Sequence, residues 1–226
     1  MANVELSEDI RATISVYANK MLHEVKLVLN TGNHKKRPEL SNFLASVASA
    51  SNNIVFEERD IGELVKGPIS FIIETNKGAT GITFSGIPSG HEFNSLILAI
   101  LQSGGVEIKL DQGLQTIIKN IDKTLNFEVF VSLSCQNCPE VVQVLNEFAL
   151  LNENITSEMI DGGLFQDIIK EKKISGVPSV YLNGELFANG RVETATLIEK
   201  LQRFSNTQSL DNSTTIETQD VVIAGG

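Results

Sequence analysis

Two cysteines separated by two residues are the part of this sequence best suited to chemistry. They occur in SLSCQNCPE (132–140), which follows an apolar run typical of a strand and precedes the apolar spacing of a helix. Two cysteines at this spacing in the first turn of a helix can close a small disulfide with little movement of the backbone. The pattern therefore predicts a redox-active dithiol.

The two thiols are expected to have different roles. Cys135 would lie at the helix N-terminus, where unpaired N–H groups and the helix dipole stabilise a thiolate, so it is predicted to be the exposed attacking thiol. Cys138, one turn into the helix, is expected to be more buried and to resolve the mixed disulfide. Pro139 is tolerated there because a first-turn N–H has no helical partner.

Two other roles for these cysteines are weaker. A structural zinc site needs four ligands, but the sequence holds no second cysteine pair, and His23, His34 and His91 all lie in the other half of the chain. Two inert core cysteines would rarely fall at this spacing at a strand-to-helix junction. Redox chemistry remains the preferred interpretation.

A proline later in the chain supports a redox site. Val177 and Pro178 directly precede the apolar run 179–182, and proline is disfavoured in a central strand unless its bond is cis or it begins the strand. In dithiol oxidoreductases of the thioredoxin type, a cis proline faces the cysteine pair and the residue before it offers backbone hydrogen bonds to a partner peptide. Val177 and Pro178 are therefore the expected substrate-binding residues, and an ordinary loop proline is the alternative.

The elements that must position this site occur in two similar halves. Each half predicts the order helix, strand, helix, strand, proline, strand, hairpin strand, helix. RPEL (37–40) resembles CPEV (138–141), and GPIS (67–70) resembles GVPS (176–179). An internal duplication predicts an α/β protein of two fused folds, each a mixed central sheet flanked by helices, and chance similarity of two generic units is the alternative. The first half has no cysteine, so only the second can carry thiol chemistry.

Composition changes along the chain predict its division. We expect the first fold over 1–106, the second over 107–204, and a flexible linker over 205–219, where SNTQSLDNSTTIETQ holds only two apolar residues. Residues 220–226, DVVIAGG, resemble a nucleotide-binding strand before its glycine turn. We interpret them as a domain cut at its boundary.

The overall composition limits the classes of partner. The 226 residues carry a net charge of −10, with 18 Lys and Arg against 28 Asp and Glu, whereas nucleic-acid binding needs a positive surplus. No apolar run approaches the roughly 20 residues of a membrane span, and the N-terminus is too acidic and polar for a signal peptide. Two cysteines are too few for a secreted disulfide scaffold. We therefore expect a cytoplasmic globular protein that binds neither nucleic acid nor membranes.

Several segments together resemble one known family. They are SLSCQNCPEVVQVLNEFALLN (132–152), MIDGGLFQDII (159–169), ISGVPSVYLNGELFANGR (174–191) and GITFSGIPSGHEFNSLILAILQSGG (81–105). These segments are similar to the N-terminal domain of the flavoprotein subunit of alkyl hydroperoxide reductase, which reduces the peroxiredoxin subunit of the same system. Such domains are similar to two fused thioredoxin folds with the cysteine pair only in the second, which agrees with the duplication.

The resemblance implies an electron relay. In the intact family protein NAD(P)H reduces FAD, the flavin reduces a second CxxC pair, and that dithiol reduces the N-terminal pair. Cys135 and Cys138 would then reduce the disulfide of the peroxiredoxin subunit of alkyl hydroperoxide reductase. FAD and NAD(P)H are implied for the full-length protein and no cofactor for this fragment. Residues 220–226 would begin a truncated FAD-binding domain, and the flavoprotein domain of the same chain would be a second partner.

The resemblance also implies a glutamate from the first fold near the cysteines, and Glu92 matches it. A carboxyl group buried beside Cys138 would have a raised pKa and could transfer protons during exchange. An acid favoured by the dipole at its helix start is a compatible alternative for Glu92. We expect His91 to be a solvent-exposed loop residue and Asp161-Gly162-Gly163 to form a turn.

The preferred function is therefore a dithiol–disulfide electron-transfer domain. A freestanding protein disulfide oxidoreductase or isomerase is an alternative, although such proteins often carry a cysteine pair in both halves and 31–34 has none. A non-enzymatic docking module, with the first fold as an adaptor, is another.

Overall fold

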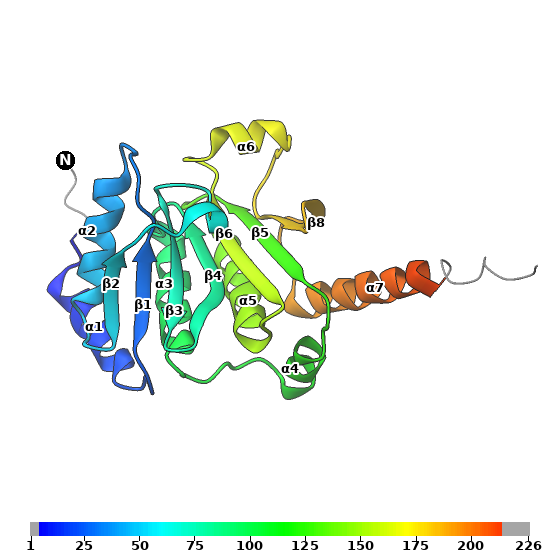
Figure 1. Ribbon diagram of the computed structural model, residues 1–226, viewed down its shortest axis with the longest axis horizontal. Helices are drawn as coiled ribbons and strands as arrows, with labels where there is room; N and C mark the ends of the chain where they lie inside the picture. Colours follow the sequence, from blue (N-terminus) through cyan, green and yellow to red (C-terminus); the bar gives the residue numbers. More distant parts are fainter. Residues whose placement is uncertain (1–4, 214–226) are drawn as a thin grey trace, which may run out of the picture. The chain divides into compact units, whose positions relative to one another are not determined.

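Eight strands form one mixed sheet in the computed structural model, which describes residues 5–213 of the chain. The order across the sheet is β2-β1-β3-β4-β6-β5-β7-β8 (Figure 1). The strands are β1 Val25–Leu29, β2 Ile54–Glu58, β3 Ser70–Thr75, β4 Gly78–Ser85, β5 Leu125–Val131, β6 Ile155–Asp161, β7 Ser179–Leu182 and β8 Glu185–Asn189.

Helices connect most of these strands. Pro38 and Pro139 lie in first turns, where a missing N–H costs no helical bond. The helices are α1 Glu8–Ala18, α2 Arg37–Ala48, α3 Phe93–Ser103, α4 Gln112–Lys119, α5 Cys138–Leu151, α6 Gln166–Glu171 and α7 Thr194–Ser213, with short 3₁₀ helices η1 Gly62–Leu64 and η2 Gly90–Glu92. The chain up to Val192 forms one compact unit, and the chain from Glu193, which holds α7, forms another.

The same four-stranded pattern occurs twice. In the first half β1 pairs in parallel with β2 and antiparallel with β3, which pairs antiparallel with β4. In the second half β5 has the same relation to β6 and β7, and β7 to β8. A crossover helix, α2 or α5, joins each parallel pair, as parallel strands require. The predicted fold class, two fused α/β folds with mixed sheets flanked by helices, is confirmed.

The two halves join at a seam between β4 and β6. Ile82 to Ser85 pair in parallel with Ser157 to Ile160, so neither strand has a free edge there. Behind the sheet α3 packs against α5, which also packs on β4 (Figure 1). The proposed boundary after residue 106 falls in the connection between α3 and α4.

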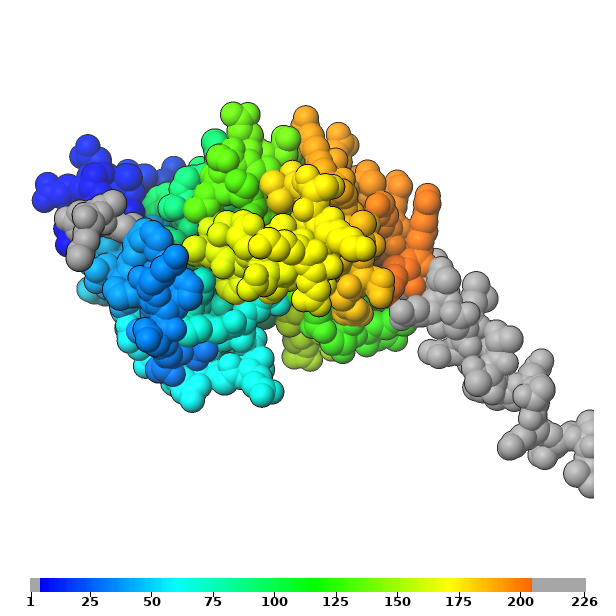
Figure 2. All heavy atoms as spheres, turned by 90° about the horizontal axis from the view of Figure 1, so that it is seen from above, coloured from blue at the N-terminus to red at the C-terminus, as the bar shows by residue number. Residues whose placement is uncertain are grey.

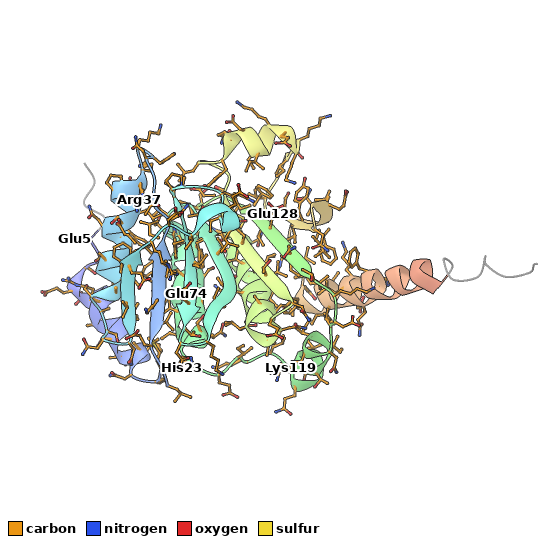
Figure 3. All side chains as sticks on the ribbon, viewed as in Figure 1. Glu5, His23, Arg37, Glu74, Lys119 and Glu128 are labelled. Atoms are coloured by element: carbon orange, nitrogen blue, oxygen red, sulfur yellow. A yellow bond between two sulfur atoms is a disulfide. The ribbon has the colours of Figure 1, made fainter. Side chains whose placement is uncertain are left out.

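Charged side chains also cross this seam. Lys66 Nζ, from the first half, lies 2.7 Å from Glu128 Oε1 on β5 and 3.1 Å from Glu158 Oε2 on β6 (Glu128 is labelled in Figure 3). Glu128 and Glu158 are partners in register on adjacent strands, so the lysine offsets the repulsion between like charges. Burial raises the pKa of Glu158, although Lys66 and a hydrogen bond from Ser85 lower it.

The core lies between the sheet and its covering helices. Each of α2, α3 and α5 buries apolar residues at helical spacing. The strands contribute the large side chains of Phe71, Phe84, Phe127 and Phe130, all less than 2% exposed.

The last described helix overlaps the segment expected to be a flexible linker. The helix α7 includes 205–213, the first part of the segment expected to be a flexible linker. No Gly or Pro interrupts 194–213, and a polar composition alone does not distinguish a linker from a helix. The rest of the expected linker, 214–219, and the expected start of the FAD-binding domain, 220–226, lie outside the described residues. None of the helices within 5–213 combines the length and the apolar character that a bilayer crossing requires.

Candidate active site

The two cysteines lie where β5 leads into α5, as the sequence predicts. A disulfide joins Cys135 and Cys138, whose Cα atoms are 5.5 Å apart. The amide of Cys135 donates to the carbonyl of Ser132 (2.9 Å), which closes the turn after β5. Cys138 is fully buried and Cys135 is partly exposed. This difference is the one expected for an attacking and a resolving thiol.

The start of α5 supplies positive potential at the sulfur atoms. Asn137 occupies the N-cap position, but its side chain makes no capping hydrogen bond. The first amide groups of α5 are therefore available to stabilise a nearby negative charge, and the helix dipole acts in the same direction. Such a position lowers the pKa of a cysteine thiol and increases the thiolate fraction.

The segment before β7 faces the cysteines. The Val177–Pro178 peptide bond is cis. The carbonyl oxygen of Val177 lies 3.9 Å from Cys135 Sγ, and Pro178 is buried. The expected juxtaposition of the cysteine pair and this dipeptide is therefore present. Figure 2 is seen from this end of the sheet, with the segment around α6 in yellow.

Glu92 is fully buried and belongs to η2, which packs against α5. Burial raises the pKa of Glu92 to about 7, and the nearby Ser95 hydroxyl lowers it to a lesser extent. Neither carboxylate oxygen makes a hydrogen bond of good geometry with the described part of the chain. Glu92 is the N-cap residue of α3, yet its side chain does not cap the helix. The neighbouring His91 is exposed, as expected, but it lies in η2 and not in a loop.

One contact that positions Glu92 was not predicted. The amide of His91 donates to the carbonyl of Leu133 (3.1 Å), in the loop that leads to the cysteines. Gly90 has φ +58°, and a Cβ there would lie 2.7 Å from the Leu133 carbonyl oxygen. Only glycine allows this approach. In the sequence, only the Gly90-His91 dipeptide hinted at a close contact here. The positions of residues along the chain do not show that its partner is Leu133.

Comparison with known proteins identifies the family. Residues 125–203 match the protein family described as "Thioredoxin domain". The crystal structure of the NTD_N/C domain of the alkyl hydroperoxide reductase AhpF from Enterococcus faecalis (V583) superimposes with a TM-score of 0.80 and 35% identity, covering 87% of this chain and 99% of that one. The chain belongs to the AhpF family of alkyl hydroperoxide reductases.

Curated AhpF relatives give the same result. Those of Staphylococcus aureus (strain Mu50) and Pseudomonas aeruginosa are 38% and 37% identical over 226 and 221 residues. These matches cover 100% and 98% of this chain and 42% of each relative's length.

A more distant structure shows the fold alone. A protein disulfide oxidoreductase from Aeropyrum pernix has a TM-score of 0.77 at 18% identity, covering 90% of this chain and 95% of that one. The thioredoxin match covers the second of the two fused folds, and the first repeats its strand pattern.

Proposed function

We propose that this chain is the dithiol–disulfide electron-transfer domain of an alkyl hydroperoxide reductase, and that it reduces the peroxiredoxin of that system. The observation that carries the proposal is the disulfide at the start of α5, with one partly exposed and one buried sulfur beside a cis proline. Family membership connects this site to peroxide reduction.

The proposed exchange has two steps and transfers two electrons. In the reduced domain the Cys135 thiolate attacks one sulfur of the partner disulfide, which forms a mixed disulfide and releases one partner thiolate. Cys138 then loses its proton and attacks Cys135 Sγ. The mixed disulfide breaks, the second partner thiolate leaves, and the Cys135–Cys138 disulfide forms.

Glu92 is the proposed acceptor of the Cys138 proton. Because Cys138 is fully buried, bulk water cannot readily take that proton. Glu92 comes from η2, which packs against the helix that Cys138 begins, and its carboxyl group lacks a competing hydrogen bond of good geometry. A carboxyl group with a pKa of about 7 can both accept and return a proton near neutral pH.

Val177 and Pro178 are the proposed substrate-binding residues. The Val177 carbonyl lies close to the attacking sulfur, so a partner strand that pairs with this backbone would bring its disulfide to Cys135. Main-chain pairing supplies affinity with little demand on the partner's sequence.

FAD and NAD(P)H are proposed for the full-length protein. The turns that follow the parallel strands β1, β5 and β6 lack the G-x-G-x-x-G spacing that holds a dinucleotide pyrophosphate, so the described residues do not fit either group. We therefore assign these cofactors to a flavoprotein domain of the same chain, the proposed source of electrons. A cytoplasmic location is proposed with them, because a reducing compartment keeps such a dithiol supplied.

The test compares two substrates in single turnovers. The reduced domain is mixed with the oxidised peroxiredoxin of an alkyl hydroperoxide reductase system or with insulin, and formation of the domain disulfide is followed. We expect fast reduction of the peroxiredoxin and slow reduction of insulin. Equal rates would favour a general disulfide oxidoreductase, which the cysteine-free loop 31–34 of the first fold already disfavours.

A further inference from the structure

Two buried acids lie at the end of the sheet that carries the cysteines. Among the described side chains, only Glu92 and Asp161 are buried acidic or basic groups, at 0% and 7% exposed. Asp161 ends β6 and is the register partner of Val131, which ends β5. Glu92 is next to His91, whose amide bonds to Leu133, two residues after Val131. The proposed exchange uses Glu92 but gives no role to Asp161.

Asp161 is fixed to the second fold by its own turn. Its carboxylate Oδ1 accepts a hydrogen bond from the amide of Gly163 (2.9 Å), and its carbonyl accepts one from the amide of Leu164 (3.0 Å). The amide of Gly162 donates to the carbonyl of Val131 (3.0 Å). The expected turn at these residues is present, and it ties Asp161 to the strand that leads to the cysteines.

The side chain of Asp161 also touches the first fold. Gly86 directly follows β4, and a Cβ there would lie 2.7 Å from the Cβ of Asp161. Gly86 has φ +122°, which other residues rarely adopt, and its amide donates to the carbonyl of Ile69 (2.9 Å). Its backbone therefore packs directly on the Asp161 side chain.

The chain from Gly86 leads in six residues to Glu92. The second fold contacts this segment near both ends: Asp161 packs on Gly86, and Leu133 binds His91. We propose that Asp161 is a positioning residue for Glu92, whose side chain holds the Gly86 end of the segment 86–92 against the second fold and so keeps Glu92 in the closed seam. The inference rests on the proposed function only in so far as that function uses Glu92 as the proton acceptor.

Loss of the Asp161 side chain would have a specific electrostatic consequence. Burial is the main cause of the raised pKa of Glu92. A gap beside Gly86 would let the segment move and admit water to the carboxyl group. The pKa of Glu92 would then fall from about 7 toward its ordinary value of 4.5.

The experiment measures the pKa of Glu92 by carboxyl ¹³C NMR in the oxidised chain, which needs no partner and no turnover. In Asp161→Gly, which removes the Cβ that packs on Gly86, we expect it to fall to roughly 6 or below. Asp161→Asn keeps the size and an oxygen for the Gly163 amide, so it should leave the value near 7. Asp111→Ala is the matched control, because Asp111 likewise accepts an amide hydrogen bond, from Leu114, at the start of α4.

A value near 7 in a folded Asp161→Gly protein would overturn the proposal and leave Asp161 as a turn residue only. If that variant does not fold, Gly86→Ala, whose Cβ would push the segment away from the Asp161 side chain, takes its place with the same expected fall and the same overturning result. A normal exchange rate in Glu92→Gln would instead remove Glu92 from the mechanism. The failure of the proposed function and the failure of this inference are therefore distinguishable.

Discussion

Cys135 Sγ lies 3.9 Å from the carbonyl oxygen of Val177, although 42 positions separate the two residues in the chain. The antiparallel pairing of β5 with β7 accounts for this approach. Cys135 follows β5 and Val177 precedes β7, so both lie at the same end of the strand pair. The approach leaves an acceptor for a partner strand beside the sulfur that we expect to attack.

The first prediction separates the roles of the two thiols. Cys135→Ser should abolish reduction of the peroxiredoxin, because the attacking sulfur is absent. Cys138→Ser should accumulate a mixed disulfide, because the resolving sulfur is absent and exchange stops halfway. Non-reducing electrophoresis and intact-mass measurement detect the adduct. Sustained turnover by Cys138→Ser would contradict the assigned roles.

The second prediction concerns the proton acceptor. Glu92→Gln should slow disulfide exchange by roughly 10-fold or more, since general acid–base groups typically contribute 10²–10⁴-fold. The rate of disulfide exchange by the wild type should increase as the pH rises through about 7, where Glu92 ionises. The variant should lack this increase. Stopped-flow mixing with the oxidised peroxiredoxin across pH 5–9 provides the comparison. If the pH profiles of the exchange rate were the same for the two proteins, Glu92 would have a structural role only.

A third prediction links the same residue to stability. The pKa of Glu92 is higher in the folded chain, so the folded state binds more protons than the unfolded state between about pH 4.5 and 7. Stability therefore falls as the pH rises through that window. Glu92→Gln does not ionise, so its stability relative to the wild type should increase from pH 5 to pH 8. Urea denaturation of the oxidised proteins measures the difference, and a constant difference would contradict the buried, ionising carboxyl.

Some of this arrangement was predictable from local sequence. Strand β7 has the expected bounds, because the short apolar run 179–182 between a proline and a turn defines it. The cysteine pair at a strand-to-helix junction was predictable for the same reason. These features depend on residues close together in the chain.

The seam was not predictable in this way. No local pattern determines that β4 and β6 join edge to edge, because that choice depends on contacts between the two halves. The burial of Glu92 followed only from a family resemblance. The packing of Asp161 on Gly86 had no signal at all, since glycine spacing does not show what the missing side chain would meet.

The fourth prediction concerns charges across the seam. Lys66→Met should destabilise the chain by about 1–3 kcal/mol, because Glu128 and Glu158 then face each other partly buried, with only Lys172, 3.9 Å from Glu128, left as a nearby cation. Lys26→Met is the matched control: it removes an ion pair with Glu57 that is more exposed and lies within the first fold, so we expect at most about 1 kcal/mol. Urea denaturation near pH 7 gives both values.

The pH dependence of that effect supplies a second check. The two glutamates lose their repulsion once they are protonated, so the destabilisation by Lys66→Met should shrink as the pH falls. Burial raises the pKa of Glu158, so protonation there begins above the ordinary range of a glutamate. An effect that stays the same at low pH would show that Lys66 acts through packing.

The last prediction tests the contact that brings η2 to the cysteine loop. Gly90→Ala places a Cβ 2.7 Å from the Leu133 carbonyl oxygen and also strains the backbone at φ +58°. Gly184→Ala, in the β7–β8 turn, is the control, because its φ of +87° is also positive but a Cβ there meets nothing within 4 Å. Both variants should lose about 1 kcal/mol from strain alone. Gly90→Ala should lose more and should also slow exchange, because the clash moves η2 and Glu92 away from α5. Equal losses and equal exchange rates would show that the close approach at Leu133 has no part in placing Glu92.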